Sequence, residues 1–521
     1  MQLNFASTCV AVALLAALQV SNAATAAASA AGIEGLVLDE YELSKVISNI
    51  HTNRDLQQNI PCGVTLSVMT PDIIRATISG LFAQVNAGGI EEAGTILTDI
   101  FPKLEFAVEM RKICASCESE GLEKLDPYCD SSAYGYDVTH SGYVFLPATI
   151  NDDGSSSIIK ATKLDTFATF RPLMRRHIDG FFINTNPPLT IFNIMAASYG
   201  LASMNFDMTG YGDSSSLVPS PVQRVSVGTA SLPIFHKVQS MIQEETRGRT
   251  KLSDKISFYG YSEGGYSSIA AADAFENSGF KIEHVYAGGA PVKVASWAIM
   301  GVLRAINTGT STIFDRLNAA LVSLPLSSTR PGVANYLAGQ DALAGDATLW
   351  LQMYTDDTVP QGDNEAYLAW IKEKYGEVVS LPVYNSNVLL NLFQDALDSN
   401  DTNPCAVDKR KPGINDKLCE ALMDQDLTEI VENADYNIDF CHAVEDNLVV
   451  IENIPEGYPI KYEIPYADHG SAVLPCLIKM FSSTEFEKPK MRKSSKGSKG
   501  SKSSKGLKVS KGSKGSRRKV K

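Results

Sequence analysis

Apolar runs alternate with helical stretches along the middle of the chain, in residues 136–291. Ile256 to Tyr261 is an apolar and aromatic run that stops at a glycine-rich turn, and Ile269 to Phe275 continues as a helix of small and apolar residues. A further run, Lys281 to Ala287, has the composition of a buried strand. Strands that alternate with helices are typical of a mostly parallel sheet. The pattern therefore predicts an α/β fold with helices on both faces of the sheet.

Residues 33–135 precede this region and carry helical patterns. Thr70 and Pro71 have the residue types of a helix cap and a first helical position. Four apolar side chains then fall on one helical face, namely Ile74, Ile78, Leu81 and Phe82. Residues 90–101 have the pattern of a second helix. We expect an N-terminal helical appendage that packs on the sheet domain.

The alternation of strands and helices is interrupted between residues 292 and 436. This stretch contains helical patterns, including residues 298–305 and 388–396, that are separated by loops. Residues 437–485 return to strand patterns. The order predicts a first core part at 136–291, a mainly helical cap insertion at 292–436 and a second core part at 437–485. A chain of 521 residues is long enough for one large core with such an insertion.

The N-terminal residues 1–23 have the pattern of a secretory signal. Val10 to Leu18 is a short apolar core, and Ser21-Asn22-Ala23 has the small residues of a cleavage site. The apolar core is too short to span a bilayer, and no other stretch reaches about 18 uninterrupted apolar residues. We therefore expect a secreted, extracellular protein with no transmembrane segment.

Residues 488–521 form a basic tail. They hold 12 Lys and 3 Arg and no acidic residue, and Lys recurs at every third position from 490 to 514 among Ser and Gly. Removing these 15 charges from the formal net charge of −13 leaves −28 on the rest of the chain. Such a composition predicts disorder and attraction to polyanions. The tail resembles silaffin-type silica-associated proteins of diatoms. Because the protein is expected to be exported, the expected partner of the tail is silica or an anionic wall polymer rather than nucleic acid.

Eight cysteines remain outside the signal, and they fall into an early and a late group. An even number of cysteines behind a signal predicts disulfides. We expect pairing within each group, with three connectivities open in each. Cys114-Ala115-Ser116-Cys117 has the spacing of a redox pair or half a zinc site, but no second such pair accompanies it. The groups are Cys62, Cys114, Cys117 and Cys129, then Cys405, Cys419, Cys441 and Cys476.

The candidate chemistry begins at Gly260-Tyr261-Ser262-Glu263-Gly264. A strand, a Gly-x-Ser-x-Gly turn and a helix follow one another here, which is the order of a nucleophile elbow. A serine hydroxyl is a weak nucleophile that becomes useful when a sharp turn exposes it to a histidine. Small residues on both sides are needed because the turn crowds strand and helix together. Ser262 is therefore the predicted nucleophile; the alternative is a glycine-rich turn with an idle serine.

Three histidines follow Ser262 in the sequence, and His469 is the predicted general base. His284 lies within a buried strand, and His442 ends a strand with little room before it for an acid-bearing loop. His469 lies in a loop just past the extended segment Ile460 to Ile464. Catalytic bases of this fold occupy such loops at the carboxyl ends of strands.

The acid of the predicted catalytic triad has two candidates. Asp446 follows the strand that ends at His442, and it is close in sequence to His469. Asp356 lies in Asp356-Asp357-Thr358-Val359 ahead of a helical stretch, more than a hundred residues before His469. We prefer Asp446 because it fits adjacent terminal strands, and Asp356 stays open. The acid must hydrogen-bond the imidazole to fix its tautomer.

These motifs together resemble the secretory lipase family of fungi and bacteria, whose members have the α/β-hydrolase fold. The resemblance covers about residues 137 to 480 and implies a lipase or esterase with a Ser-His-Asp triad and no metal or cofactor. It is carried by four segments, 204–214, 260–265, 287–291 and 468–472.

The resemblance also implies an oxyanion hole made of two backbone N–H groups. The first belongs to Glu263, the residue after the nucleophile, and the second to Phe181. The chain departs from the family here, because Asp179-Gly180 stands where the family has His-Gly. A carboxylate beside a developing oxyanion is unfavourable unless it points away.

The sequence thus predicts a secreted serine hydrolase that cleaves carboxylic esters through an acyl-enzyme. A serine peptidase on the same fold is the alternative enzyme, because the triad does not encode the leaving group. A wall- or silica-binding protein with a catalytically dead hydrolase body is the alternative of another class, and the departure at Asp179 favours it.

Overall fold

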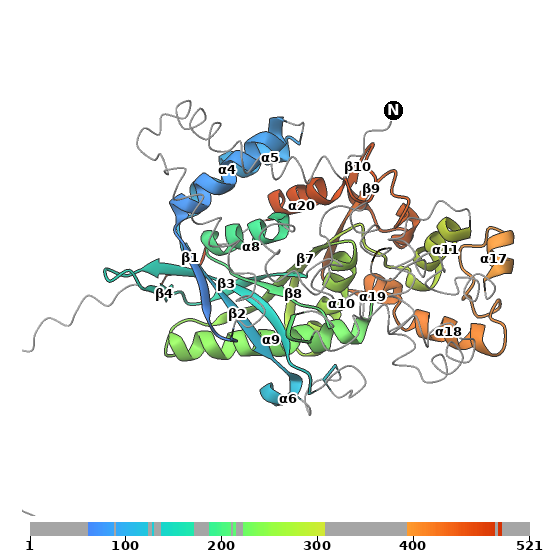
Figure 1. The fold of residues 1–521 in the computed structure, drawn as a ribbon, viewed down its shortest axis with the longest axis horizontal. Helices are drawn as coiled ribbons and strands as arrows, with labels where there is room; N and C mark the ends of the chain where they lie inside the picture. The colour runs from blue at the N-terminus through green and yellow to red at the C-terminus, as the bar shows by residue number, and fades with distance from the viewer. Residues whose placement is uncertain are drawn as a thin grey trace, which may run out of the picture.

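A ten-stranded sheet organises the protein (Figure 1). The structure is a computed structural model that describes residues 61–87, 90–122, 128–129, 137–170, 187–209, 212–214, 222–307, 373, 393–484 and 488–491. The strand order is β1-β2-β3-β6-β5-β7-β8-β9-β10, and β4 pairs with β3. The strands are β1 (Thr65–Met69), β2 (Ala107–Ala115), β3 (His140–Ile150), β4 (Ser156–Ile158), β5 (Leu164–Phe170), β6 (Ala202–Phe206), β7 (Leu252–Tyr261), β8 (Lys281–Gly288), β9 (Asn437–Ala443) and β10 (Ile460–Ile464).

The sheet has an antiparallel part and a parallel part. The pairs among β1, β2, β3, β4 and β6 are antiparallel. From β6 through β5, β7, β8 and β9 to β10, every pair is parallel. The parallel strands therefore share one carboxyl edge, where loops from several strands can meet.

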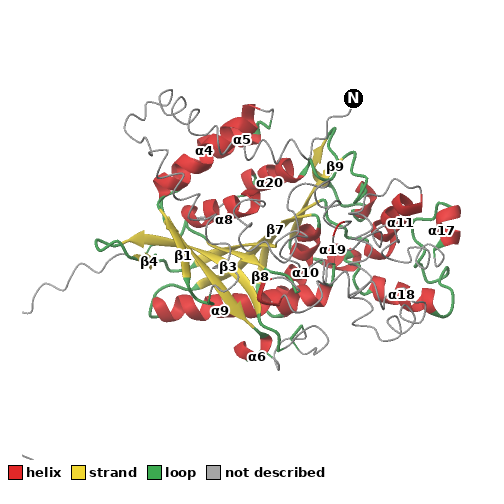
Figure 2. Cartoon of the chain, viewed as in Figure 1, coloured by secondary structure: helices red, strands yellow, loops and turns green. Residues whose placement is uncertain are grey.

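Helices cover both faces of the sheet (Figure 2). One face carries α4 (Pro71–Ala87), α8 (Pro187–Tyr199) and α20 (Val473–Ser482), and the other carries α9 (Arg224–Glu245) and α10 (Glu263–Asn277). Each face has its own apolar core, because successive strand residues point to opposite sides. In β7, Phe258 packs on the α10 face and Tyr259 packs on the α20 face.

The N-terminal region differs from the helical appendage expected from the sequence. It contains α4 and the short helix α5 (Glu92–Thr95), but β1 and β2 also belong to it. β2 pairs with β3 along nine residues, from Ala107 opposite Ala148 to Ala115 opposite His140. The region therefore extends the central sheet as well as covering it.

The part of the cap region that the structure describes is helical. It contains α11 (Ile299–Asn307), α17 (Gln394–Asp398), α18 (Ile414–Met423) and α19 (Thr428–Asn433). Figure 1 draws α17 and α18 at the opposite end of the molecule from β4. These helices stand between β8 and β9 in the sequence, where the insertion was expected.

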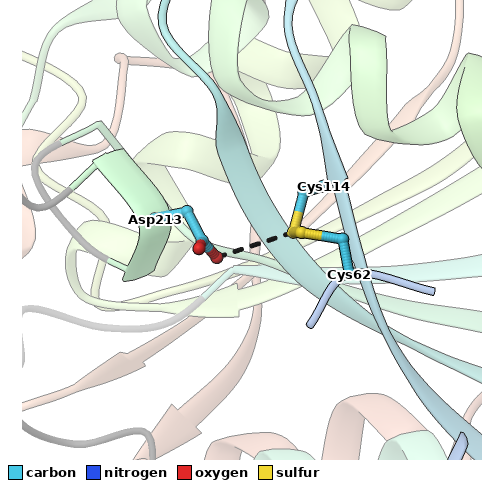
Figure 3. A group of neighbouring side chains, drawn as sticks. All are labelled: Cys62, Cys114 and Asp213. Atoms are coloured by element: carbon cyan, nitrogen blue, oxygen red, sulfur yellow. Dashed lines mark hydrogen bonds between the residues drawn. A yellow bond between two sulfur atoms is a disulfide. The ribbon is translucent and has the colours of Figure 1, made fainter. Parts of the chain in front are cut away.

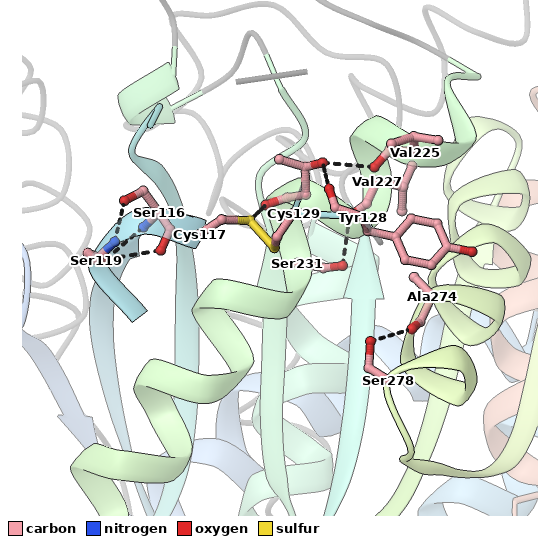
Figure 4. Close-up of a disulfide and its surroundings, with 11 residues drawn as sticks. Ser116, Cys117, Ser119, Tyr128, Cys129, Val225, Val227, Ser231, Ala274 and Ser278 are labelled. Atoms are coloured by element: carbon pink, nitrogen blue, oxygen red, sulfur yellow. Dashed lines mark hydrogen bonds between the residues drawn. A yellow bond between two sulfur atoms is a disulfide. The ribbon is translucent and has the colours of Figure 1, made fainter. Parts of the chain in front are cut away.

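Four disulfides join the eight cysteines, and pairing within each group is confirmed. Cys117, which begins α6 (Cys117–Glu120), pairs with Cys129 beside α9 (Figure 4). The neighbouring residue Tyr128 accepts a hydrogen bond on its carbonyl from Thr229 Oγ1 of α9 at 2.7 Å. The other three pairs are Cys62–Cys114, Cys405–Cys419 and Cys441–Cys476.

The pairing decides against the redox or zinc interpretation of Cys114 and Cys117. Cys62, Cys114 and Asp213 lie close enough to suggest a metal site (Figure 3). The two sulfur atoms are bonded to each other, however, so neither offers a thiolate. Asp213 instead forms an ion pair with Lys112 at 2.7 Å.

The last described residues, 488–491, are attached to the body. Met491 forms a β-bridge with Ala161, and Lys490 O accepts a hydrogen bond from Thr162 N–H at 3.0 Å. Pro489 packs against Gly200, whose φ is +122°. Within the described ranges, no helix has the length and hydropathy that a bilayer crossing requires.

Candidate active site

Ser262 stands at the turn between β7 and α10. Its φ of 58° and ψ of −125° are rare for a residue with a side chain, as a sharp strand-to-helix turn requires. A Cβ on Gly260 would lie 2.0 Å from Gly264 O, and one on Gly265 would lie 2.7 Å from Gly288 O. Only glycine therefore allows the strand and helix to approach this closely, as the elbow pattern predicted.

His469 reaches Ser262 from the loop after β10. Its Nε2 lies 2.8 Å from Ser262 Oγ. The hydroxyl of Tyr261, at the end of β7, donates to the carbonyl oxygen of His469 at 2.7 Å. This bond attaches the histidine loop to the strand that carries the serine.

Asp446 completes a chain of hydrogen bonds from the loop after β9. Its Oδ2 lies 2.6 Å from His469 Nδ1. Its Oδ1 accepts from the backbone N–H groups of Leu448 at 3.0 Å and Val449 at 2.8 Å. These partners assign the imidazole tautomer: Nδ1–H donates to the carboxylate, and Nε2 can accept from the serine hydroxyl.

His442 supports the acid loop from behind, a role that the sequence did not reveal. This fully buried side chain donates from Nε2 to Val449 O at 2.7 Å, and the same nitrogen lies 3.7 Å from Asp446 Oδ2. Burial lowers the pKa of His442, which favours the neutral ring. The backbone of Val449 is thus held by its N–H to Asp446 and by its C=O to His442. The signal available in the sequence was a histidine at the end of a strand, four residues before a candidate acid.

The disulfide Cys441–Cys476 joins the elements on which the acid and histidine loops rest. Cys441 is in β9 and Cys476 is in α20. The 35-residue separation between them includes both Asp446 and His469. The geometry of the two side chains therefore depends on a covalently closed segment.

Glu263 begins α10, directly after the serine. The first N–H groups of a helix have no acceptor within the helix, so the backbone N–H of Glu263 is available to an oxyanion. The residue is 2% exposed, and burial raises the pKa of its side chain to about 8, with only partial opposition from the backbone of Val222. The Glu263 side chain is therefore mainly protonated and uncharged at neutral pH.

Three positions of interest lie outside the described residues: Phe181, Asp179 and the alternative acid Asp356. The described histidine His284 lies away from the serine, since its Nε2 pairs with Asp439 at 2.9 Å and its ring stacks on Tyr286. Among the predicted residues, the structure thus brings Ser262, His469, Asp446 and Glu263 together.

The arrangement has the elements of nucleophilic catalysis. A hydroxyl, an imidazole and a carboxylate lie in one hydrogen-bonded series, and the first backbone N–H of α10 adjoins the hydroxyl. In such a series the ring can take the hydroxyl proton while the carboxylate stabilises the imidazolium that forms.

Comparison with known proteins identifies the fold. No family model matches the chain, and no curated protein matches it. A mutant of the rice cell wall degrading esterase LipA from Xanthomonas oryzae aligns with a TM-score of 0.50 and 13% identity, covering 82% of this chain and 96% of that one. Candida antarctica lipase A aligns with a TM-score of 0.39 and 13% identity, covering 81% of this chain and 79% of that one.

At such identities a structural similarity shows the fold alone. The alignment with the LipA mutant, at a TM-score of 0.50, is the one that identifies the fold. The chain has the α/β-hydrolase fold, with a mostly parallel sheet and helices on both faces. The fold class predicted from the sequence is confirmed.

Proposed function

We propose that this protein is a secreted serine hydrolase that cleaves carboxylic esters. One observation carries the proposal: Ser262, His469 and Asp446 form an unbroken hydrogen-bonded series at the carboxyl edge of the parallel strands. The esterase among the similar structures supports an ester as the substrate. Whether the enzyme prefers lipid or soluble esters depends on the acyl chain length that it accepts.

In the proposed mechanism, Ser262 Oγ attacks the ester carbonyl while His469 Nε2 takes its proton. The ring then gives this proton to the leaving alcohol, and an acyl-serine remains. Water, activated by the same ring, hydrolyses the acyl-enzyme. Asp446 holds Nδ1–H and stabilises the imidazolium. The backbone N–H of Glu263, with that of Phe181, binds the oxyanion.

Two further properties belong to this proposal. Export is supported by the signal pattern and by four disulfides, which persist in oxidising compartments. The basic tail is assigned to attachment to an anionic wall polymer or silica, because 15 basic residues without an acidic one attract polyanions.

The test of the catalytic assignment is Ser262→Ala in the full chain. Without the nucleophile, only oxyanion and binding contributions remain, so kcat on a p-nitrophenyl ester should fall by about 10⁴- to 10⁶-fold. Circular dichroism should match the wild type, and Ser157→Ala at an exposed position of β4 is the control that keeps full activity. Turnover by the Ser262→Ala variant close to that of the wild type would refute the assignment.

Two parallel measurements separate the alternatives. A fluorophosphonate probe should label the wild type at Ser262 and leave the alanine variant unlabelled; an unlabelled wild type would favour the catalytically dead binding protein. Turnover of a p-nitroanilide that matches the p-nitrophenyl ester in its acyl part tests the peptidase. Faster cleavage of the amide would replace esterase by peptidase.

A further inference from the structure

Three short segments of the body form a basic surface that we call the basic rim: residues 159–163, 247–251 and 488–491. Together they contain seven basic residues and no acidic residue. The seven are Lys160, Lys163, Arg247, Arg249, Lys251, Lys488 and Lys490, and all are exposed. The rest of the chain before the tail is strongly acidic, so this concentration of positive charge stands out.

Hydrogen bonds hold the three segments of the basic rim together. Thr162 N–H donates to Lys490 O at 3.0 Å, and Leu164 N–H donates to Lys251 O at 2.9 Å. The hydroxyl of Thr250 donates to Ile159 O at 2.9 Å. Segments that are far apart in the sequence therefore present their charges side by side on a fixed framework.

Most of this charge is not neutralised locally. Lys163 pairs with Asp254 and Lys488 pairs with Glu105, both at exposed positions. The other five basic residues form no ion pair with any residue that the structure describes. A cluster of unpaired cations on one face attracts an anionic partner.

The basic tail continues from the basic rim. Residues 488–491 are the last described part of the chain, and the 30 residues that follow add 13 basic side chains. In the sequence, the positively charged tail therefore follows directly on a surface that is itself positively charged. The acidic remainder of the body repels a polyanion, so the rim is the face that such a partner can approach.

We propose that the basic rim is a docking face for an acidic polysaccharide, continuous with the basic tail. Arg247 and Arg249 favour this partner, because the planar guanidinium matches the paired oxygens of a carboxylate or sulfate. Isolated surface oxyanions of silica offer no such pair. This inference concerns attachment and does not depend on the proposed hydrolysis.

The position of the rim sets the orientation of the docked protein. Residues 159–163 and 247–251 precede β5 and β7, so they lie at the amino edge of the parallel strands. Ser262 follows β7 at the carboxyl edge. β7 has 10 residues, and at about 3.3 Å per residue it separates the two edges by about 30 Å. A polymer bound at the rim therefore leaves the candidate active site uncovered.

The experiment compares full-length proteins on polygalacturonate beads over a range of NaCl concentrations. The rim variant is Arg247→Gln/Arg249→Gln/Lys251→Gln. The control, Lys103→Gln/Lys409→Gln/Lys411→Gln, removes the same charge at exposed positions elsewhere. At about 0.1 M salt we expect the Kd of the rim variant to rise about 10-fold and that of the control less than about 2-fold. Equal Kd values for the two variants would overturn the docking face, and unchanged melting temperatures verify that both variants are folded.

Two further measurements test the occupant and the contact. On silica particles, the rim variant should lose less affinity than on polygalacturonate; an equal or larger loss on silica would assign the face to a mineral and overturn the polysaccharide. Lysine acetylation read by mass spectrometry should show Lys160 and Lys251 protected by polygalacturonate while Lys103 stays reactive. Equal reactivity of all three lysines with and without polymer would also contradict the proposal.

Discussion

At the scale of single residues, Asp446 serves two purposes with its two oxygens. Oδ2 holds the ring of His469, and Oδ1 closes its own loop by accepting from Leu448 and Val449. The Asp446 side chain is fully buried, so its charge is little screened by water. It can therefore both orient an imidazole and stabilise the positive charge that develops on it.

The first residue-scale prediction is that Asp446→Asn lowers kcat by about 10³- to 10⁴-fold. An amide cannot supply the negative charge, and its NH₂ group favours the wrong imidazole tautomer. The measurement is steady-state hydrolysis of a p-nitrophenyl ester, with Asp356→Asn as the matched comparison. Asp356→Asn should lower kcat far less. A larger loss of kcat in Asp356→Asn than in Asp446→Asn would make Asp356 the acid.

The second residue-scale prediction concerns the pH dependence of stability. The pKa of Glu263, about 8, lies above its ordinary value of 4.5, so the folded protein binds this proton more tightly than the unfolded chain. The stabilisation of the folded protein by this bound proton is complete below about pH 4.5 and is lost as the pH rises to about 8. Gln stays neutral at every pH, so Glu263→Gln should match the wild type in Tm at about pH 4.5 and exceed it by several degrees at about pH 8.5.

Thermal unfolding at a series of pH values checks the Glu263 prediction. The same exchange at the exposed Glu244 is the control, because that side chain is solvated in the folded protein as it is in the unfolded chain. A Tm difference between Glu263→Gln and the wild type that does not grow with pH would contradict the assigned protonation.

Chain order and local pattern predicted Ser262 and His469 and preferred Asp446 over Asp356, and the first three side chains meet in the structure. Ser262 has a strand, glycines and a helix around it, and His469 and Asp446 follow strands that end at the same edge of a parallel sheet. The contribution of His442 could not be predicted, because it depends on which backbone carbonyl faces a buried ring. Such a contact arises from the folded path of a loop and leaves no periodic signal.

At the scale of elements, the elbow predicts a sharp difference between two glycines. A Cβ on Gly260 would meet backbone atoms of Gly264 at 2.0 and 2.1 Å, and backbone cannot move aside cheaply. Gly260→Ala should therefore lower the free energy of unfolding by at least about 3 kcal/mol. A Cβ on Gly264 would lie 3.2 Å from Phe170 O, its nearest neighbour, so Gly264→Ala should stay within about 1 kcal/mol of the wild type.

Urea unfolding of both variants measures this contrast between the glycines. Similar stability of Gly260→Ala and Gly264→Ala would show that the strand and helix do not approach as described.

Helices and strands could be predicted where the pattern of buried residues is periodic or depends only on neighbours in the sequence. The segment Ile460 to Ile464 has the same bounds in the pattern and in β10. β2 was missed because it mixes charged residues into a buried strand. Arg111 pairs with Glu109 at 2.7 Å and Lys112 pairs with Asp213 at 2.7 Å, so these charges are tolerated inside. Asp213 lies more than a hundred residues after Lys112, and a partner at that distance is invisible to a local pattern.

At the scale of the whole molecule, the tail should contribute to attachment and not to catalysis. A chain that ends at Met491 keeps the contacts of residues 488–491 and loses 13 basic residues. Its kcat/KM on a small soluble ester should equal that of the full chain, because the tail begins at the edge opposite Ser262. Its binding to silica or anionic polysaccharide should fall strongly at low salt and differ little above about 0.5 M salt, where charges are screened.

Pull-down on silica and on polygalacturonate at two salt concentrations checks the tail prediction. Equal binding of the full and shortened chains, or binding insensitive to salt, would show that the tail does not attach the protein.

The bond between Cys441 and Cys476 also implies an order of maturation. A newly synthesised chain holds these cysteines as thiols, and oxidising compartments such as the endoplasmic reticulum lumen or the periplasm allow them to pair. Until then, the loops that carry Asp446 and His469 are joined only by noncovalent contacts. Closing a segment of this length removes about 3 to 4 kcal/mol of conformational freedom from the unfolded chain. A copy whose two cysteines remain reduced would therefore hold these loops less securely, so on the proposed function the enzyme would gain its full activity only after this bond has formed.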